Sequence, residues 1–408
     1  MTTPATPVVH EGRSGRSVLV LNSGSSSLKY QLVDAGSGDA LASGIIESVG
    51  EASSGVRHDV DGVRTERSLA VADHAAALQV VLGLFDGVGP PLADAGIVAV
   101  GHRVVHGGTR FLQAVVIDDA VEADIEALSP LAPLHNPANL TGIRVARRLL
   151  PDVPHVAVCD TAFFATLPEA AATYALNAEV ARAHQVRRYG AHGTSHRYVS
   201  REVASFLGRD VAELNQIVLH LGNGASASAV RGGEAIDTSM GLTPLEGLVM
   251  GTRTGDIDPA AVFHLHRNAG LSIDEIDDLF NRRSGVKGLS GVADMRELHA
   301  LVASGDEGAR LALDVYLLRL RKYVGAYHAE LGRLDVITFT AGIGENDDTV
   351  RAGALAGLAG WGIEVDPERN AVRSSQPRVI SPDGARVTVL VVPTNEELEI
   401  TRQTLAAL

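Results

Sequence analysis

One short segment occurs twice in this chain, at an offset of 200 residues. Residues 18–27, VLVLNSGSSS, align without gaps with residues 218–227, VLHLGNGASA, and five of the ten positions are identical. In each copy an apolar run enters a turn of small residues, and a second strand-like run follows at 28–34 or 226–231. Chance alone can also produce such a match in a chain rich in Ala, Val, Leu and Gly. The repeat predicts two related halves, each with a β-hairpin phosphate loop, and the two loops facing one cleft.

The first turn, residues 22–29 (NSGSSSLK), has the residue types of a phosphate loop. Gly24 frees the backbone, so its N–H groups can point at an anion. Ser25 and Ser27 can donate a hydrogen bond or ligate a metal, and Lys29 can reach phosphoryl oxygens. The same composition is also typical of a Ser-rich hairpin turn, so the turn alone does not decide between the two.

Length and charge narrow the class of protein. A chain of 408 residues with 45% apolar residues exceeds the size at which single cores stop growing, roughly 250 residues. We expect a disordered tail (1–16), an N-terminal domain (17–160) joined by a C-terminal helix (396–408), and a second domain (161–395). The net charge of −14 and the absence of Lys/Arg runs argue against nucleic-acid or membrane binding.

The compartment follows from what the sequence lacks. The single cysteine, Cys159, excludes an intrachain disulfide and fits a reducing environment. No apolar stretch approaches the ~20 residues of a membrane span, and residues 1–16 lack the apolar centre of a signal peptide. We therefore expect a cytoplasmic protein.

Strand-like and helix-like segments alternate along the chain, which indicates α/β domains. The polar segment 50–68 looks like an exposed excursion outside the core. The leucine-rich segment 306–331 has helical spacing and should be a long buried helix. The other predicted strands are 96–101, 154–159, 334–340 and 387–392, and the other predicted helices are 137–150, 194–207 and 257–269.

Charged or imidazole groups beside glycines follow several of these strands, where α/β sheets bind their ligands. Six such segments stand out: GHRVVHGG (101–108), YGAHGTSH (189–196), HLGNG (220–224), GTRTGD (251–256), AGIGEN (341–346) and TNEE (394–397).

The histidine spacing suggests an alternative, a zinc site. His102 and His106 are four residues apart, as are His192 and His196, but neither pair encloses the Glu typical of zinc hydrolases with this spacing. We therefore disfavour zinc. A Walker-type phosphate loop is also absent, because no Gly-Lys-Ser/Thr occurs.

Two arginines lie in glycine-framed loops. Arg103 and Arg253 suit planar oxyanions, because a guanidinium can bind carboxylate or phosphate through two parallel hydrogen bonds. Either arginine alone could simply be a solvated surface residue. Asp160 follows a strand directly, so it can orient an arginine or a metal-bound water, or else cap the next helix.

Together these segments resemble the acetate kinase family within the actin/Hsp70/sugar-kinase superfamily. The resemblance spans residues 18–403 and runs in order through NSGSSSLK (22–29), GHRVVHGG (101–108), PLHNP (133–137), DTAF (160–163), HGTSH (192–196), GTRTGD (251–256) and GIGEN (342–346). It implies a two-domain actin/Hsp70-like fold, a duplicated ribonuclease H-like βββαβαβα unit. In this fold 17–160 would be the N-terminal acetokinase domain, joined by the helix 396–408, and 161–395 the C-terminal nucleotide-binding domain.

The activity implied is reversible, Mg²⁺-dependent in-line transfer of the γ-phosphoryl group from ATP to acetate, giving acetyl phosphate and ADP, with Mn²⁺ as an alternative metal. By the same resemblance Asn22 and Glu396 hold the metal, Arg103 and Arg253 clamp the carboxylate and the phosphoryl group, and His192 donates to that group. Asp160 orients Arg103, and Ser25, Ser27 and Lys29 lie along the phosphates. The remaining nucleotide-binding residues implied are His220, Leu221, Gly222, Asn223, Gly224, Asp294, Met295, Arg296, Gly342, Ile343, Gly344, Glu345 and Asn346.

The chain departs from the family pattern twice. Position 191 is Ala where the family usually has Phe, in the pocket for the acetate methyl group beside Val105, Leu134 and Pro244. Losing that ring predicts a larger pocket that tolerates propionate better. Position 164 is Phe where His is usual.

Two other functions compete with acetate kinase. One is a sibling enzyme for propionate or butyrate, although the bulk of Val105 favours the shorter acid. The other, from a different class, is an ATP-gated binding protein of the actin/Hsp70 kind, which needs no carboxylate clamp. The family resemblance also implies a homodimer whose domains close over the nucleotide.

Overall fold

The structure, a computed structural model, describes residues 15–24, 26–133 and 135–408. Contacts divide the described residues into two compact units. The first unit contains those up to Ala162 together with Glu396–Leu408, and the second contains Phe163–Asn395. Most of the predicted tail lies outside the described residues, and our assignment of a function to each domain stays a prediction.

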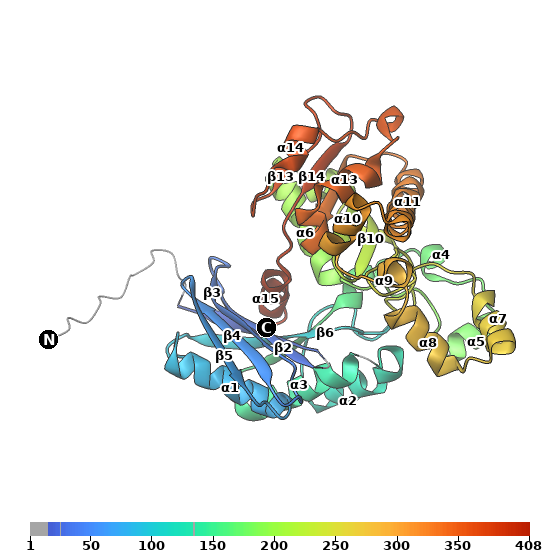
Figure 1. Ribbon diagram of the computed structural model, residues 1–408. Helices are drawn as coiled ribbons and strands as arrows, with labels where there is room; N and C mark the ends of the chain where they lie inside the picture. Colours follow the sequence, from blue (N-terminus) through green and yellow to red (C-terminus); the bar gives the residue numbers. More distant parts are fainter. Residues whose placement is uncertain (1–14, 25, 134) are drawn as a thin grey trace. The chain divides into compact units, whose positions relative to one another are not determined.

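The first unit is built on an eight-stranded sheet with the order β5-β4-β3-β2-β1-β6-β8-β7. Strand β1 pairs antiparallel with β2 and parallel with β6, and β6 pairs parallel with β8. Figure 1 shows this sheet in blue and cyan with its helices. Its elements are β1 (Ser17–Ser23), β2 (Ser27–Asp34), β3 (Ala40–Glu47), β4 (Ser54–Val60), β5 (Val63–Leu69), α1 (His74–Gly87), β6 (Ile97–Val104), β7 (Val115–Val116), α2 (Asp119–Ala127), α3 (Asn136–Leu149), β8 (His155–Cys159) and α15 (Glu396–Ala406).

Both faces of this sheet are covered, and the apolar central residues of β1, Val18–Leu21, pack alternately against the two layers. Leu19 and Leu21 pack in one cluster with residues of α1 and α3. Val18 and Val20 point to the other face and pack with Ile400 of α15. The alternation has the two-residue period of a strand, and it explains why this run reads as continuously hydrophobic.

The prediction for residues 50–68 was wrong. Strands β4 and β5 form an antiparallel hairpin there that extends the sheet beyond β3. Val56 and His58 are buried, and the His58 ring is hydrogen-bonded to the Tyr30 hydroxyl at 2.7 Å. Only β5, the edge strand, is mostly polar and mostly exposed, and it dominated the composition of the segment.

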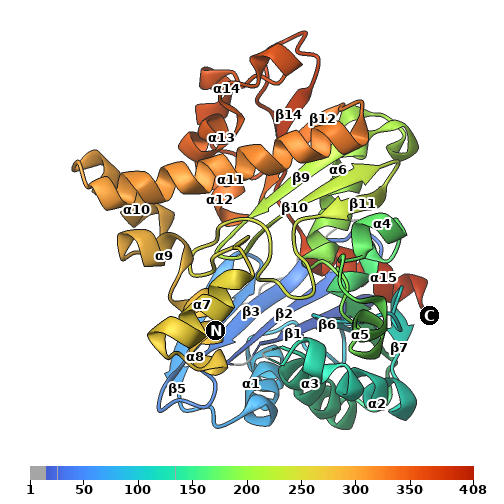
Figure 2. The same cartoon turned by 90° about the vertical axis from the view of Figure 1, so that its right-hand side faces the viewer.

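The second unit has a six-stranded sheet with the order β11-β10-β9-β12-β14-β13. Figure 2 shows the long helix α11 lying along this sheet. The strands are β9 (Asn215–Leu221), β10 (Ala225–Arg231), β11 (Glu234–Thr238), β12 (Val336–Thr340), β13 (Arg378–Val379) and β14 (Thr388–Val391). The helices are α4 (Glu169–Ala172), α5 (Ala178–Ala183), α6 (Gly193–Leu207), α7 (Ala260–Ala269), α8 (Ile273–Arg282), α9 (Gly285–Ser290), α10 (Met295–Ala303), α11 (Glu307–Leu331), α12 (Ala341–Asn346), α13 (Asp348–Leu355) and α14 (Pro367–Ala371).

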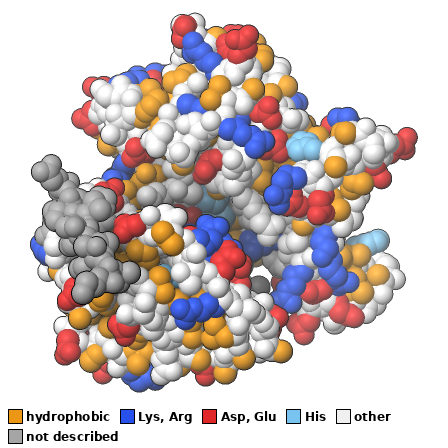
Figure 3. Space-filling view, turned by 60° about the vertical axis from the view of Figure 1, so that its left-hand side comes forward, with side chains coloured by type: hydrophobic (Ala, Val, Ile, Leu, Met, Phe, Trp, Pro, Cys, Tyr) orange, Lys and Arg blue, Asp and Glu red, His pale blue; other side chains and the backbone are white. Residues whose placement is uncertain are grey.

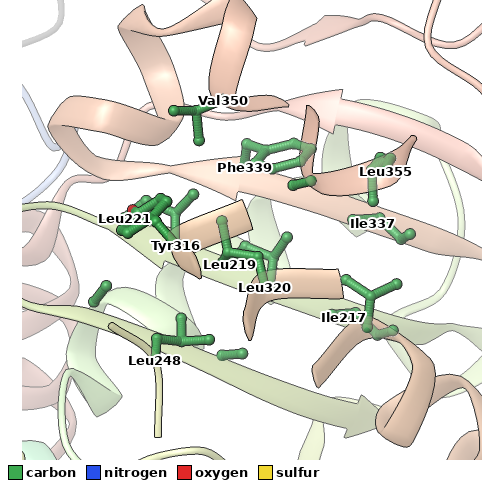
Figure 4. Packing of buried hydrophobic residues seen from close by; sticks show 14 of the residues in the cluster. Ile217, Leu219, Leu221, Leu248, Tyr316, Leu320, Ile337, Phe339, Val350 and Leu355 are labelled. Atoms are coloured by element: carbon green, nitrogen blue, oxygen red, sulfur yellow. The ribbon is translucent and has the colours of Figure 1, made fainter. Parts of the chain in front are cut away.

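Helix α11 supplies one wall of the second core. Tyr316 and Leu320 pack against Leu219 of β9 and the neighbouring strands (Figure 4). The prediction that this segment is a long helix is confirmed, but it is not buried all round. Leu311 and Leu318 are 55% and 52% exposed, because the helix buries one stripe and leaves the other to solvent.

The repeat seen in the sequence corresponds to a repeated topology. Strand β9 pairs antiparallel with β10 and parallel with β12, just as β1 pairs with β2 and β6. The orders β3-β2-β1-β6-β8 and β11-β10-β9-β12-β14 are therefore equivalent. This confirms the duplicated α/β fold, with one hairpin loop at the same place in each unit.

Acidic and basic side chains are interspersed on the face displayed in Figure 3. The chain carries 49 Asp and Glu against 35 Lys and Arg. Among the described helices, none has both the length and the apolar character needed to cross a bilayer.

Candidate functional site

The first hairpin loop is closed by its own backbone. Strand β1 ends at Ser23, and the Gly24 N–H donates to the Ser27 carbonyl at 2.8 Å. Lys29 lies on β2, directly opposite Asn22, and its ammonium group is paired with Glu397. Ser25 lies outside the described residues.

Two side chains donate hydrogen bonds to backbone carbonyl groups of this loop. The Asn139 amide on α3 donates to the Ser23 carbonyl at 2.6 Å, and the His74 ring on α1 donates to the Gly24 carbonyl at 2.7 Å. The Asn139 amide oxygen also accepts from the Val105 N–H at 3.0 Å. A single buried amide therefore ties the first hairpin loop to the segment that directly follows β6.

Arg103, on β6, is held by Asp160 at the end of β8. Its Nε donates to both carboxylate oxygens at 3.2 Å, and its Nη2 donates at 2.7 Å. The Asp160 side chain is 1% exposed and the Arg103 side chain 19%. Within the part of the chain that the structure describes, Arg103 Nη1 has no hydrogen-bond partner. The structure thus fixes one edge of the guanidinium and leaves the other edge for a ligand.

The start of α15 adds carboxylates to this site. Glu396 Oε2 lies 3.8 Å from Arg103 Nε. Burial alone would lower the pKa of Arg103, but the Asp160 and Glu396 charges outweigh it and raise that pKa above its ordinary value. Arg103 therefore keeps its charge at any pH at which the protein is folded. Helix α15 packs on β1, whose end carries Asn22, so this corner of the first unit offers one carboxylate and one amide oxygen.

In the second unit, His192 caps α6 in a left-handed backbone conformation (φ 60°, ψ 25°). Such a conformation is strained for a residue other than glycine and often occurs at functional sites. The His192 ring is stacked on His220 at 4.3 Å between centroids. A Cβ at Gly224 would lie 3.6 Å from the His192 ring and 3.7 Å from Arg253 Nη1, so the second hairpin loop brings these groups together.

Arg253 lies in a loop tied to that second hairpin loop. The Gly251 N–H donates to the Asn223 carbonyl at 3.0 Å, and Arg253 Nη1 donates to the Pro244 carbonyl at 3.2 Å. Burial lowers the pKa of Arg253, although it remains a cation at physiological pH. A buried, weakly compensated guanidinium favours an anionic ligand beside it.

The second unit also contains a cavity of about 990 Å³. It brings together eight of the predicted nucleotide-binding residues: Gly222, Asn223, Asp294, Met295, Arg296, Gly342, Ile343 and Asn346. Sequence reasoning missed six others that line it: Ala293, His299, Asp347, Asp348, Thr349 and Arg373. Asp347 and His299 are hydrogen-bonded to each other at 2.7 Å.

Several predicted nucleotide-binding residues lie outside this cavity's lining. The Leu221 side chain is buried in the core, and the Gly344 carbonyl accepts from Arg351 at 2.9 Å. One Glu345 carboxylate oxygen accepts from the backbone N–H groups of Ala341 and Thr394, so this side chain has a structural task. His220, Gly224 and Lys29 likewise do not line it.

The predicted methyl pocket is only partly described. Leu134 lies outside the described residues, Val105 and Pro244 are half-buried, and Ala191 is 4% exposed within the core cluster of the second unit. A Cβ at Gly190, next to Ala191, would collide with the Phe164 ring. The two departures from the family pattern are therefore neighbours in space.

Comparisons with known proteins agree over nearly the whole chain. The family described as "Acetokinase family" matches residues 17–402. An acetate kinase of Leifsonia xyli is 62% identical over 390 residues, covering 96% of this chain and 98% of the relative. Among solved structures, an acetate kinase of Porphyromonas gingivalis is 44% identical with a TM-score of 0.91, covering 96% of this chain and 99% of that one. A propionate kinase of Francisella tularensis is 40% identical with the same TM-score of 0.91, covering 96% and 100%. The chain belongs to the acetokinase family.

Proposed function

We propose that this protein catalyses the reversible, Mg²⁺-dependent transfer of the γ-phosphoryl group of ATP to acetate, giving acetyl phosphate and ADP. The observation that carries the proposal is the Arg103–Asp160 pair. A guanidinium held along one edge presents donors along the other in a fixed plane, which is the pattern a carboxylate accepts. Membership of the acetokinase family supports the same reaction.

The step itself needs no proton transfer. A carboxylate oxygen of acetate attacks the γ-phosphorus, the bond from that phosphorus to the bridging oxygen breaks, and ADP leaves with the electron pair. Both reactants are anions, so positioning and charge stabilisation supply most of the catalysis. A covalent enzyme intermediate is not part of the proposal.

The chain's own cations take these tasks. Arg103 binds and orients the carboxylate, and Asp160 holds Arg103 in place. Arg253 and His192 donate hydrogen bonds to the oxygens of the phosphoryl group during its transfer, because these oxygens carry the developing charge. We assign the 990 Å³ cavity to adenosine and the first hairpin loop, through Ser27, to the phosphates.

The metal belongs with Asn22 and Glu396. Amide and carboxylate oxygens are ligands that Mg²⁺ accepts, and Mg²⁺ usually takes few protein ligands because it keeps waters and substrate phosphates. Bound there, the ion would supply positive charge that offsets the charge of the phosphates. Mn²⁺ would fit the same oxygen ligands.

The preferred acid is acetate, with propionate as the second candidate. Both the small side chain of Ala191 and the structural match to a propionate kinase favour some tolerance of propionate. One methylene in an apolar pocket is worth only ~1 to 3 kcal/mol, so discrimination should be modest.

The family residue at position 191 cannot be restored alone. Ala191 is 4% exposed within the core cluster of the second unit, and the Phe164 ring lies against the adjacent Gly190. Ala191→Phe should therefore overpack the core and destabilise the fold by about 1–3 kcal/mol. We expect Ala191→Phe combined with Phe164→His to fold better and to lower the efficiency with propionate relative to acetate. An unchanged ratio of efficiencies in a folded double variant would contradict the pocket assignment.

The experiment that tests the reaction is acyl phosphate formation from Mg·ATP, trapped as hydroxamate, with acetate, propionate and butyrate over full concentration ranges. The proposal predicts the highest kcat/KM with acetate. A preference for propionate would keep the mechanism and change the substrate. Failure to form any acyl phosphate, with slow ATP hydrolysis independent of acid, would instead favour an ATP-gated binding protein.

We also propose a cytoplasmic homodimer whose domains close over the nucleotide, on the family resemblance alone. Light scattering of the purified protein would test the dimer, and a monomer at micromolar concentration would contradict it.

A further inference from the structure

A row of alternating serines and histidines runs through the second unit behind His192. His192 and His196 lie one turn apart on α6, and Ser226 and Ser228 lie two residues apart on β10. The spacings of helix and strand match, so the two rows of side chains interleave. Ser226 Oγ lies 2.9 Å from His192 Nδ1 and 2.7 Å from His196 Nε2, and Ser228 Oγ lies 2.7 Å from His196 Nδ1.

The residues of this row that follow His192 are fully buried. His196, Ser226 and Ser228 are each 0% exposed. Burial, and then the nearby His220 ring, hold the pKa of His196 well below its ordinary value, so that ring is neutral. A neutral imidazole has one N–H donor and one acceptor nitrogen. Ser226 could also accept from both rings, but its own hydroxyl hydrogen would then have no acceptor among the described groups. Two arrangements of the four side chains therefore satisfy Ser226, one the reverse of the other.

Ser228, at the end of the row, determines in which direction the hydrogen bonds run. Of the groups that the structure describes, His196 Nδ1 is the one hydrogen-bond partner of the Ser228 hydroxyl. In one direction Ser228 donates to His196 Nδ1, His196 Nε2–H donates to Ser226, and Ser226 donates to His192 Nδ1. In the reverse direction the Ser228 hydroxyl hydrogen has no acceptor, and a buried donor without an acceptor is costly.

We propose that Ser228, His196 and Ser226 are positioning residues that hold His192 in the tautomer with its proton on Nε2. That tautomer keeps Nδ1 occupied as an acceptor and leaves the Nε2–H to donate outward. The inference rests on the proposed function in one respect, namely that His192 Nε2–H donates a hydrogen bond to the phosphoryl group during its transfer.

The row also opposes a second proton on His192. Protonating Nδ1 would force Ser226 to accept from His192. Either the Ser226 hydroxyl, or, if His196 moves its own proton to Nδ1, the Ser228 hydroxyl would then lose its acceptor among the described groups. Two neighbouring groups act in the same direction, because the stacked His220 ring and the nearby Arg253 guanidinium disfavour an added positive charge.

The test is the tautomer and titration of His192, followed by ¹⁵N NMR of the labelled full-length protein and assigned by comparison with His192→Asn. In the wild type, Nδ1 should behave as an unprotonated acceptor between pH 6 and 8. Ser226→Ala removes the donor, so His192 should take up its second proton at a higher pH, and kcat should fall about three- to tenfold. Ser226→Thr keeps the hydroxyl and should restore both properties.

Ser200→Ala is the matched control. Ser200 is also 0% exposed and lies on α6, but its hydroxyl donates to the Arg197 carbonyl within the helix. The control should change neither the titration of His192 nor kcat beyond twofold. His196→Gln, which keeps an amide donor for Ser226, should leave His192 closer to wild type than His196→Leu does.

Three results would overturn the inference. They are a wild-type His192 with its proton on Nδ1, a titration unchanged by Ser226→Ala, or an equal shift in Ser200→Ala. Failure of the proposed function would look different, because the wild type would then form no acyl phosphate while the NMR result could still hold.

Discussion

The Arg103–Asp160 pair allows the fold and the chemistry to be tested separately. Asp160 is 1% exposed and accepts from Arg103 Nε and Nη2. Removing one partner of a buried ion pair typically destabilises a protein by about 3–5 kcal/mol, because the other charge stays buried. Arg103→Ala should therefore lower the free energy of unfolding by about that amount, and kcat by about 10³ or more, since the carboxylate clamp is lost.

A second substitution should separate these two effects. In Arg103→Ala/Asp160→Asn a neutral amide replaces the buried carboxylate, so most of the lost stability should return, whereas activity should not. Arg103→Lys keeps the charge but cannot bind Asp160 and acetate together in one plane, so it should lose two charge-assisted hydrogen bonds worth about 1.5–3 kcal/mol each. That corresponds to about 10² to 10⁴ in kcat/KM for acetate, or roughly a factor of ten per 1.4 kcal/mol.

The assays are urea unfolding and the hydroxamate reaction, measured on the same preparations. Arg110→Ala is the matched control, because Arg110 is 52% exposed and pairs with Asp124 on the surface. It should change stability by less than about 1 kcal/mol and leave kcat unaltered. Recovery of activity in the double variant, or loss of less than tenfold in Arg103→Ala, would refute the clamp.

Three further predictions concern the rest of the site and the fold. Arg253→Ala should cut kcat by about 10³ or more with little change in unfolding, measured beside the exposed control Arg283→Ala; a mild loss would show that Arg253 is misassigned. Asn139→Leu should lower the free energy of unfolding by about 2–6 kcal/mol in urea, because two buried backbone groups lose their partner; a loss below about 1 kcal/mol would contradict the bridge. Burial, and then the Asp237 charge, raise the pKa of Glu330 from 4.5 to about 7, so the folded state holds a proton that the unfolded state releases, and stability should fall as pH rises from about 4.5 to about 7. Glu330→Gln should flatten that part of the stability profile in thermal melts, and an unchanged slope would contradict the assignment.

The fold could be predicted from the sequence wherever the local pattern of apolar residues matches the burial of that segment in the fold. The repeat at 18–27 and 218–227 marked equivalent hairpins because a buried parallel strand must be apolar and its loop must be small. Predicted strands such as 154–159 and 334–340 lie within two residues of β8 and β12. The hairpin at 54–69 was not predicted, because an exposed edge strand can be mostly polar and then lacks the apolar pattern of a strand.

The family resemblance, together with residues beside strand ends and glycines, predicted much of the site. Eight of the predicted nucleotide-binding residues line one cavity, but His299, which lies on α10 with no glycine beside it and also lines that cavity, was not predicted. Asn139 lies in the first turn of α3, and only the structure shows that its amide reaches both Ser23 and Val105. The His192/His196 spacing, considered for zinc, belongs to a hydrogen-bonded row with Ser226, a partner distant in sequence.

The central claim is that the acid itself accepts the phosphoryl group. ³¹P NMR of the wild-type enzyme with Mg·ATP and acetate follows every phosphorus species at once. The account predicts that acetyl phosphate and ADP appear in equal amounts, that inorganic phosphate stays at its background rate, and that both products depend on acetate. Release of inorganic phosphate from ATP at a rate independent of acetate, with no acetyl phosphate signal, would contradict it.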